Sequence, residues 1–158
     1  MRVGIGYDIH RFEEGRRLVL GGVEFAGDTG LAGHSDADVL VHAVIDALLG
    51  AAALGDIGSH FPPDHPAYEG ANSIDLLRNT AKLLADNGFA VESVDSTLIA
   101  EMPRMAPHIA RMRKHMANAL GIDGGRVNVK ATTNEGLGPI GRGEGMAAMA
   151  VALISAAE

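Results

Sequence analysis

The sequence predicts an α+β sandwich, a fold in which three helices cover one face of a small mixed sheet. Segments that alternate as strands do and segments with apolar residues at helical spacing follow one another along the chain. The length of 158 residues fits a single domain spanning 1–158. Apolar residues make up 47% and charged residues 21%, which is ordinary for a globular protein.

Two strands are expected near the N-terminus. Residues 1–12 alternate between apolar and polar side chains, and residues 17–25 form a second candidate, split by Gly21 and Gly22. Residues 27–33 are rich in glycine and are expected to form a loop.

The first helix is expected to begin at Ser35. Serine is a favoured N-cap, and Asp38 stands three residues later, in the capping-box position. The helix should run to about Leu54, where Gly55 closes it. Residues 55–72 are then a long connection rich in Gly, Pro, His and Asp, which is typical of a functional or mobile loop.

In the second half of the chain, the pattern predicts a helix, a strand, a second helix and a second strand, in that order. Residues 73–87 form an amphipathic helix, residues 91–100 alternate as a strand, and residues 107–120 form the third helix. Residues 126–132 are a short strand.

The C-terminal segment is ambiguous by pattern alone. After a glycine-rich turn at 136–145, residues 146–157 are almost continuously apolar, which fits a helix or a fully buried strand.

Charge and composition exclude several functions. The net charge of −7 disfavours sequence-independent binding to nucleic acid and docking on an anionic membrane. The absence of cysteine excludes disulfides and thiolate metal sites. No signal peptide or membrane span is apparent, so a cytoplasmic location is expected.

Asp8 and His10 are candidate metal ligands because residues two apart on a strand project from the same face. The alternative is an ordinary hydrogen bond between them on a solvated strand. Asp38, His42 and Asp46 form a polar stripe on an otherwise apolar helix. His42 could bond Asp46 within the core, or it could complete a metal site with Asp8 and His10 while Asp46 steadies its ring. Three protein ligands with a fourth position open are typical of a catalytic zinc.

Two further segments are candidates for phosphate contacts, and a third is rich in glycine and charge. His34 and Ser35 stand at the expected helix start, where backbone N–H groups favour anions. Residues 130–138 combine hydroxyls, glycines and Glu135, whose carboxylate suits Mg²⁺. Residues 141–145 alternate charge with glycine. The alternatives are that Ser35 only caps the helix and that His34 is an ordinary exposed histidine. Residues 130–138 could be a solvated turn, and residues 141–145 a turn with a surface ion pair.

Taken together, these residues resemble the 2-C-methyl-D-erythritol 2,4-cyclodiphosphate synthase family of the non-mevalonate isoprenoid pathway. The matching stretches, in the family's order, are residues 6–10 (GYDIH), 32–38 (AGHSDAD), 42–46 (HAVID), 50–58 (GAAALGDIG), 127–133 (VNVKATT) and 141–145 (GRGEG). The resemblance implies a homotrimer with sheets around a threefold axis, active sites between subunits, and a strand at the C-terminus. It implies a cytidine diphosphate-linked substrate that cyclises with loss of CMP.

The resemblance also implies roles for individual residues. Asp8, His10 and His42 match zinc ligands, with one Zn²⁺ or another divalent metal per subunit, and Glu135 matches the ligand of a second ion, Mg²⁺ or Mn²⁺. His34 and Thr133 match positions of transition-state stabilisation. The substrate contacts implied by matching positions are Ser35, Asp56, Ile57, Gly58, Phe61, Asp64, His65, Ala100, Met105, Ala106, Ala131, Thr132 and Arg142.

The sequence departs from the family's pattern at two prolines. Pro63 stands where the family usually has Asp, so Asp64 or His65 is expected to serve instead. Pro139 stands where many members have Phe, beside the Arg142–Glu144 pair expected to line an axial cavity that could hold an isoprenoid diphosphate. Two other functions fit the residues alone, namely a metal-dependent phosphoesterase that uses water and a non-enzymatic trimeric metal-binding module.

Overall fold

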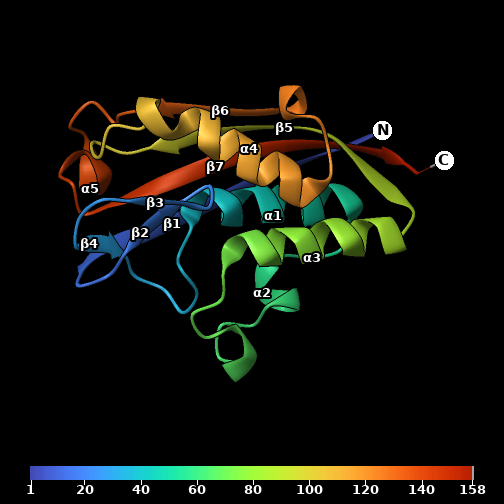
Figure 1. The fold of residues 1–158 in the computed structure, drawn as a ribbon, viewed down its shortest axis with the longest axis horizontal. Coiled ribbons are helices and arrows are strands. Elements are labelled where there is room, and N and C mark those ends of the chain that lie inside the picture. Colours follow the sequence, from blue (N-terminus) through green and yellow to red (C-terminus); the bar gives the residue numbers. More distant parts are fainter. Residues whose placement is uncertain (158) are drawn as a thin grey trace.

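A five-stranded sheet forms the centre of the fold, and the long helices lie on one of its faces (Figure 1). The computed structural model describes residues 1–157. The strand order is β4-β1-β7-β5-β6, where β5 and β6 are parallel and the other neighbours are antiparallel. The strands are β1 (Arg2–Glu14), β4 (Thr29–Leu31), β5 (Phe89–Ile99), β6 (Val127–Thr132) and β7 (Gly145–Ala156). The predicted α+β class, with a mixed sheet, is therefore confirmed.

Three long helices cover the sheet. They are α1 (Val39–Ala52), α3 (Ser73–Asp86) and α4 (Ile109–Leu120). Helix α1 packs directly on β1 and β7, α3 contacts both α1 and α4, and α4 reaches β6. Most of α1 is buried, because the sheet covers one side and α3 the other. None of the helices within residues 1–157 is long and apolar enough to cross a bilayer.

Smaller elements complete the fold. The hairpin of β2 (Leu18–Leu20) and β3 (Val23–Phe25) confirms the strand expected over 17–25 and its split at the two glycines. Short helices α2 (Ile57–His60) and α5 (Gly138–Gly141) lie within the segments 55–72 and 136–145, which were expected to be a loop and a turn. Turns of 3-10 helix occur at Pro66–Tyr68, Ala106–His108 and Gly124–Arg126. The prediction that residues 27–33 form a loop was wrong in part, because β4 lies within them and pairs with the end of β1. Three residues are too few to show an alternating pattern.

The predicted start of α1 was wrong. The N-cap is Asp38, whose carboxylate accepts a hydrogen bond from the Val41 N–H, and the helix begins at Val39 rather than after Ser35. The same carboxylate accepts hydrogen bonds from the N–H groups of Gly21 and Gly22, at 2.9 and 2.8 Å. Asp38 therefore caps the helix and satisfies two N–H groups of the β2–β3 turn together.

The C-terminal segment is a strand. Strand β7 lies between β1 and β5 and pairs with both along most of its length. Its apolar run is thus explained by burial within the sheet rather than by helical packing.

Candidate metal centre

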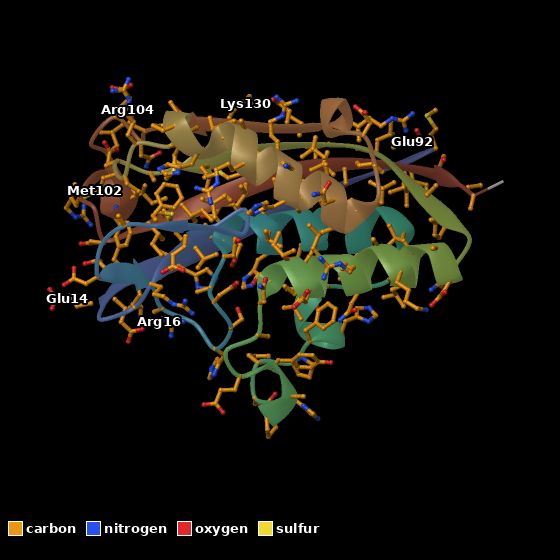
Figure 2. All side chains as sticks on the ribbon, viewed as in Figure 1. Glu14, Arg16, Glu92, Met102, Arg104 and Lys130 are labelled. Atoms are coloured by element: carbon orange, nitrogen blue, oxygen red, sulfur yellow. The ribbon has the colours of Figure 1, made fainter. Side chains whose placement is uncertain are left out.

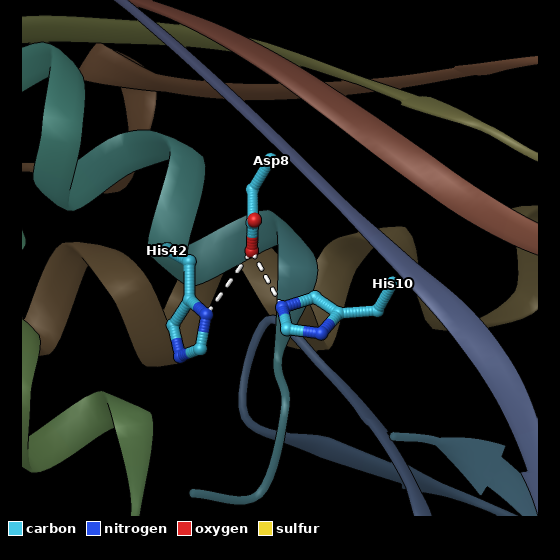
Figure 3. Close-up of side chains that lie close together, drawn as sticks. All are labelled: Asp8, His10 and His42. Carbon is cyan, nitrogen blue, oxygen red and sulfur yellow. Dashed lines mark hydrogen bonds and ion pairs between the residues drawn. The ribbon is translucent and has the colours of Figure 1, made fainter. Parts of the chain in front are cut away.

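Three metal-ligating side chains meet where β1 passes the first turn of α1 (Figure 3). Asp8 and His10 project from β1 toward the helices, and His42 projects from α1. The Asp8 Oδ2 atom lies 2.8 Å from His10 Nε2 and 3.1 Å from His42 Nδ1. The three ligand atoms all lie within 4.8 Å of one another, so one ion can contact all of them.

The two histidines present different ring nitrogens to Asp8. The Nδ1–H of His10 donates to the carbonyl oxygen of Ala32 at 2.7 Å, which directs Nε2 toward Asp8. His42 has the opposite orientation, with Nδ1 toward Asp8 and Nε2 at 2.9 Å from the Ser73 hydroxyl oxygen. Each ring is therefore held by a hydrogen bond on the nitrogen that faces away from the triad.

The charges of the triad fit a divalent cation. Burial tends to raise the pKa of Asp8, but hydrogen bonds and the charges of His10 and His42 outweigh it and lower the pKa to about 2. Burial tends to lower the pKa of His10, but the hydrogen bond and charge of Asp8 outweigh it and raise that pKa. A carboxylate with two imidazoles around one point is a donor set that Zn²⁺ accepts.

A cavity of about 230 Å³ opens beside the triad. It brings together most of the residues expected near the metal with four that were not predicted as site residues, namely Gly33, Pro63, Tyr68 and Leu76. The lining consists of Asp8, His10, Gly33, His34, Ser35, His42, Ile57, Gly58, Phe61, Pro63, Tyr68 and Leu76. The predicted phosphate-contact residues His34 and Ser35 thus face the same space as the triad.

Three other predicted residues do not line this cavity, and their side chains accept hydrogen bonds from backbone N–H groups instead. The Asp46 carboxylate accepts a hydrogen bond from the Ile57 N–H at 2.7 Å, and within residues 1–157 no hydrogen bond joins it to His42. Asp56 caps α2 through the Ser59 N–H, and His65 caps the following 3-10 turn through the Ala67 N–H. Asp64 is exposed in the same loop.

A second group of predicted substrate-contact residues lies at the ends of β5 and β6, on strands at the other side of the sheet from β1. The N–H of Ala100 donates to the carbonyl oxygen of Thr132, and Glu101 accepts hydrogen bonds from the backbone of Asn134 and Gly136. These contacts join the segment after β5 to the turn after β6. Met105 is buried and Ala106 is exposed in the first segment, Ala131 is exposed near the end of β6, and Thr133 and Glu135 are exposed in the turn. Figure 2 shows Met102 and Arg104 projecting from the same loop, at the end of the sheet where α5 lies.

Arg142 and Glu144 form an exposed ion pair, with Arg142 Nε 3.2 Å from Glu144 Oε1. Glu144 and Pro139 line a larger cavity of about 800 Å³ between the α5 turn and residues 9–14 of β1. The triad contributes only His10 to this cavity.

The sequence missed one buried residue at the centre, Ser73. Its hydroxyl oxygen contacts His42, and its hydroxyl donates to the Asp36 carboxylate. The only local signal was a serine at a helix start, which reads as capping.

The fold and the triad define an α+β protein with a group of side chains that could hold a metal ion. The chain belongs to the YgbB family, whose model matches residues 1–155. Curated relatives over nearly the whole chain are named 2-C-methyl-D-erythritol 2,4-cyclodiphosphate synthase. The protein of Dehalococcoides mccartyi is 57% identical and covers 98% of each chain. That of Clostridium perfringens is 54% identical over 98% of this chain and 99% of its own.

Solved structures share the fold. The bifunctional IspDF of Campylobacter jejuni superposes with a TM-score of 0.94 at 41% identity, covering 98% of this chain and 42% of that one. A CDP complex of Plasmodium falciparum IspF has a TM-score of 0.86 at 31% identity, over 99% and 97% of the two chains.

Proposed function

We infer that this chain converts 4-diphosphocytidyl-2-C-methyl-D-erythritol 2-phosphate to 2-C-methyl-D-erythritol 2,4-cyclodiphosphate and releases CMP, in the non-mevalonate isoprenoid precursor pathway. It is a cyclising phosphorus–oxygen lyase. The observation that carries this inference is the sequence identity of 57% to a synthase of that name over 98% of the chain. The triad of this chain also lines a cavity. We propose that residues 1–158 act as one synthase domain.

The reaction needs no protein nucleophile. An oxygen of the substrate's 2-phosphate attacks the β-phosphorus, and the bond from that phosphorus to the CMP oxygen breaks. The work left to the protein is to hold the two phosphates in line and to offset their charge. This agrees with a site rich in hydrogen-bond donors and metal ligands.

The residues of the cavity divide this work. Asp8, His10 and His42 would hold a divalent cation, Zn²⁺ or another metal at one per subunit, which would supply positive charge to a phosphate oxygen. His34 and Ser35 face the same cavity and can donate hydrogen bonds to the phosphate. Gly58 presents backbone without a side chain in the way, and Phe61 packs edge-on against Tyr68 with ring centroids 5.5 Å apart, which shapes the apolar wall.

The turn after β6 binds the other half of the substrate in this proposal. Glu135 is an exposed carboxylate that suits Mg²⁺ or Mn²⁺ on the diphosphate, and Thr133 lies beside it, its Oγ1 accepting from the Glu135 N–H. The cytidine diphosphate portion lies on residues 100–106 and 131–133, and the methylerythritol portion on residues 56–58. Relatives solved with CDP support a cytidine diphosphate-linked substrate.

The separation of these two halves supports active sites between subunits. In the sheet Ile9 pairs with Ala147, Ala147 with Ile99, and Ile99 with Thr132. The triad and the Thr132 turn thus share one end of the sheet but lie three strand spacings apart, roughly 14 Å. A single diphosphate is too short to span that distance, so we propose that a neighbouring copy supplies the second half.

The outer face of the sheet supports a homotrimer. Alternate residues of β1 and their partners on β7 are apolar and between 42% and 67% exposed in the single chain: Val3, Ile5, Tyr7, Ile9, Met149 and Val151. An exposed apolar sheet face of this kind marks an association surface. The proposed trimer places these strands at its axis, where the cavity beside Pro139 could hold an isoprenoid diphosphate. We expect no nucleic-acid or membrane partner and a cytoplasmic location.

Phosphorus NMR of the reaction products tests the function. The purified chain with Zn²⁺, Mg²⁺ and the substrate should yield CMP and a cyclic diphosphate. A linear phosphate would instead identify a hydrolase that uses water, and no release of CMP would identify a binding module.

A further inference from the structure

The Ser73 hydroxyl is buried at the first position of α3, between an acid and a metal-ligand candidate. The residue is 0% exposed. Its hydroxyl donates to Asp36 Oδ1, and its oxygen lies 2.9 Å from His42 Nε2. Helix capping does not explain this hydroxyl, because the N-cap of α3 is Asn72, whose side chain accepts from the Ile74 N–H.

The Asp36 carboxylate determines where the Ser73 proton goes. Its Oδ2 accepts the Ser73 N–H at 3.0 Å, and its Oδ1 accepts the Asp38 N–H at 3.2 Å as well as the Ser73 hydroxyl. A carboxylate surrounded by donors only accepts. The single hydroxyl proton of Ser73 is therefore committed to Asp36.

That commitment fixes the proton on the His42 ring. Since the Ser73 oxygen has no proton left to give, it can only accept from Nε2–H of His42. In the neutral ring the proton then sits on Nε2, and the lone pair of Nδ1 is on the side of Asp8, 3.1 Å away, where a metal ion can take it. The orientation that suits a metal ligand follows from a chain of two hydrogen bonds that begins at Asp36.

The proton on His42 Nε2 also leaves the Ser35 hydroxyl proton without an acceptor on His42. Its oxygen lies 3.2 Å from His42 Nε2 and accepts the Ala37 N–H at 3.1 Å. A protonated Nε2 cannot accept a hydrogen bond from Ser35. The Ser35 proton is thus available to an anion in the cavity that this residue lines.

From this arrangement we propose that Ser73, held by Asp36, is a positioning residue that keeps His42 in its metal-binding tautomer and leaves Ser35 as a donor to substrate phosphate. The proposal deepens the proposed function and rests on it. Ser73 is not among the residues that line the cavity, and in this account it acts on the substrate only through His42.

The test compares two buried hydroxyls of the same helix in the full chain. Ser73→Ala removes the hydroxyl that contacts His42, and Thr80→Val removes one that donates only to the Leu76 carbonyl. Zn²⁺ affinity, measured by competition with a chromophoric chelator, should fall about 10- to 100-fold in Ser73→Ala. It should stay within about twofold of wild type in Thr80→Val, which has no contact with a ligand. Equal affinities in Ser73→Ala and wild type would overturn the proposal.

Nitrogen-15 NMR of the Zn²⁺-loaded protein gives a readout that a purely structural role would not change. In wild type the His42 Nε2–H should be a slowly exchanging signal, and in Ser73→Ala it should exchange with water at least tenfold faster. Asp36→Asn keeps the size of the side chain but lets an amide donate to Ser73, so the same signal should weaken. An unchanged signal in both variants would refute the proposed chain of hydrogen bonds from His42 through Ser73 to Asp36.

A His42→Ala variant separates this inference from the metal site itself. If His42→Ala bound Zn²⁺ as tightly as wild type, the proposed metal site would be wrong. If His42→Ala lost Zn²⁺ while Ser73→Ala kept it, the metal site would stand and only the role of Ser73 would fall.

Discussion

Gly6 lies so close to helix α1 that a Cβ atom built on it would stand 1.9 Å from the carbonyl oxygen of Ala43. Gly4 makes the same approach one turn further along, 2.0 Å from the Ala47 carbonyl. Backbone therefore packs on backbone between β1 and α1. Because Asp8 follows Gly6 by two residues and His42 precedes Ala43, this contact sets the distance across the triad.

Gly6→Ala should force β1 and α1 apart. No flexible side chain can absorb the overlap, so we expect a loss of about 3 kcal/mol or more in the free energy of unfolding. We also expect weakened Zn²⁺ binding, since His42 moves with the helix. Urea denaturation and a zinc assay measure the two effects.

Gly50→Ala is the matched control for Gly6→Ala. Gly50 lies on α1. A Cβ atom built on it would have the Ile5 carbonyl oxygen as its nearest neighbour, at 4.0 Å, so it would meet no overlap. It should be neutral or stabilise the protein by about 0.5–1 kcal/mol through helix propensity. Equal destabilisation by the two variants would show that the close contact at Gly6 is not the cause.

The metal-free protein should have a pH window of added stability from the Asp8–His10 pair. The pKa of Asp8 is lowered from 3.8 to about 2, so its contribution is present above pH 3.8 and is lost as the pH falls toward 2. The pKa of His10 is raised above 6.5, so its contribution is present below pH 6.5 and is lost as the pH rises through the raised value. We expect about 1–2 kcal/mol between these limits, reduced by partial exposure.

Chemical denaturation of the chelator-treated protein across pH 3–8 measures this window, and Asp8→Asn is its control. The asparagine cannot form the ion pair, so the window should disappear. A wild-type curve parallel to that of Asp8→Asn over this range would contradict the assignment.

Asp38→Asn should destabilise the protein by about 1–3 kcal/mol. Both carboxylate oxygens accept backbone N–H groups, so an amide must place its own donor against Gly21, Gly22 or Val41. Asp123→Asn is the comparison, because that exposed aspartate caps a 3-10 turn through one N–H, from Gly125. Thermal unfolding of both should separate them clearly, and equal melting temperatures would argue against a special role for Asp38.

Glu135→Gln should raise the Mg²⁺ concentration needed for half-maximal CMP release while the zinc content stays the same. The substitution keeps the size of the side chain but removes the charge that suits a hard cation. The proposed division of the two ions requires that the triad be unaffected. A fall in zinc content by elemental analysis would therefore contradict it.

Ile5→Asp should dissociate the proposed trimer. The side chain is exposed at the centre of the apolar sheet face, beside Val151, and a carboxylate there would be desolvated on association. Asn118→Asp adds the same charge on an exposed position of α4, away from that face. Sedimentation velocity should show smaller particles only for Ile5→Asp. A trimer that survives this change would place the association surface elsewhere.

Local pattern was enough to predict most elements but not all of their boundaries. Helix α3 begins at Ser73 as expected, since its apolar spacing is clear. Helix α1 does not, because Ser35 and Asp38 both suit an N-cap and the choice depends on the distant N–H groups of Gly21 and Gly22. Strand β7 likewise needed its partners β1 and β5 to be distinguished from a helix.

The triad could be predicted because its residue types carry the chemistry themselves. The role of Ser73 could not, because it lies 31 positions from His42 and meets it only when α1 and α3 pack together. Asp46 illustrates the opposite error, since a helical spacing of four from His42 does not ensure a hydrogen bond, and its carboxylate accepts the Ile57 N–H instead.

The sheet order, which keeps the β1 triad apart from the β6 turn, has a genetic consequence. If each site takes its two halves from different chains, a chain lacking His42 and a chain lacking Glu135 can repair each other when they assemble together. Each mixed trimer would then contain one site with both halves intact. Random mixing in equal amounts would restore about a quarter of wild-type activity, from two proteins that are each inactive alone.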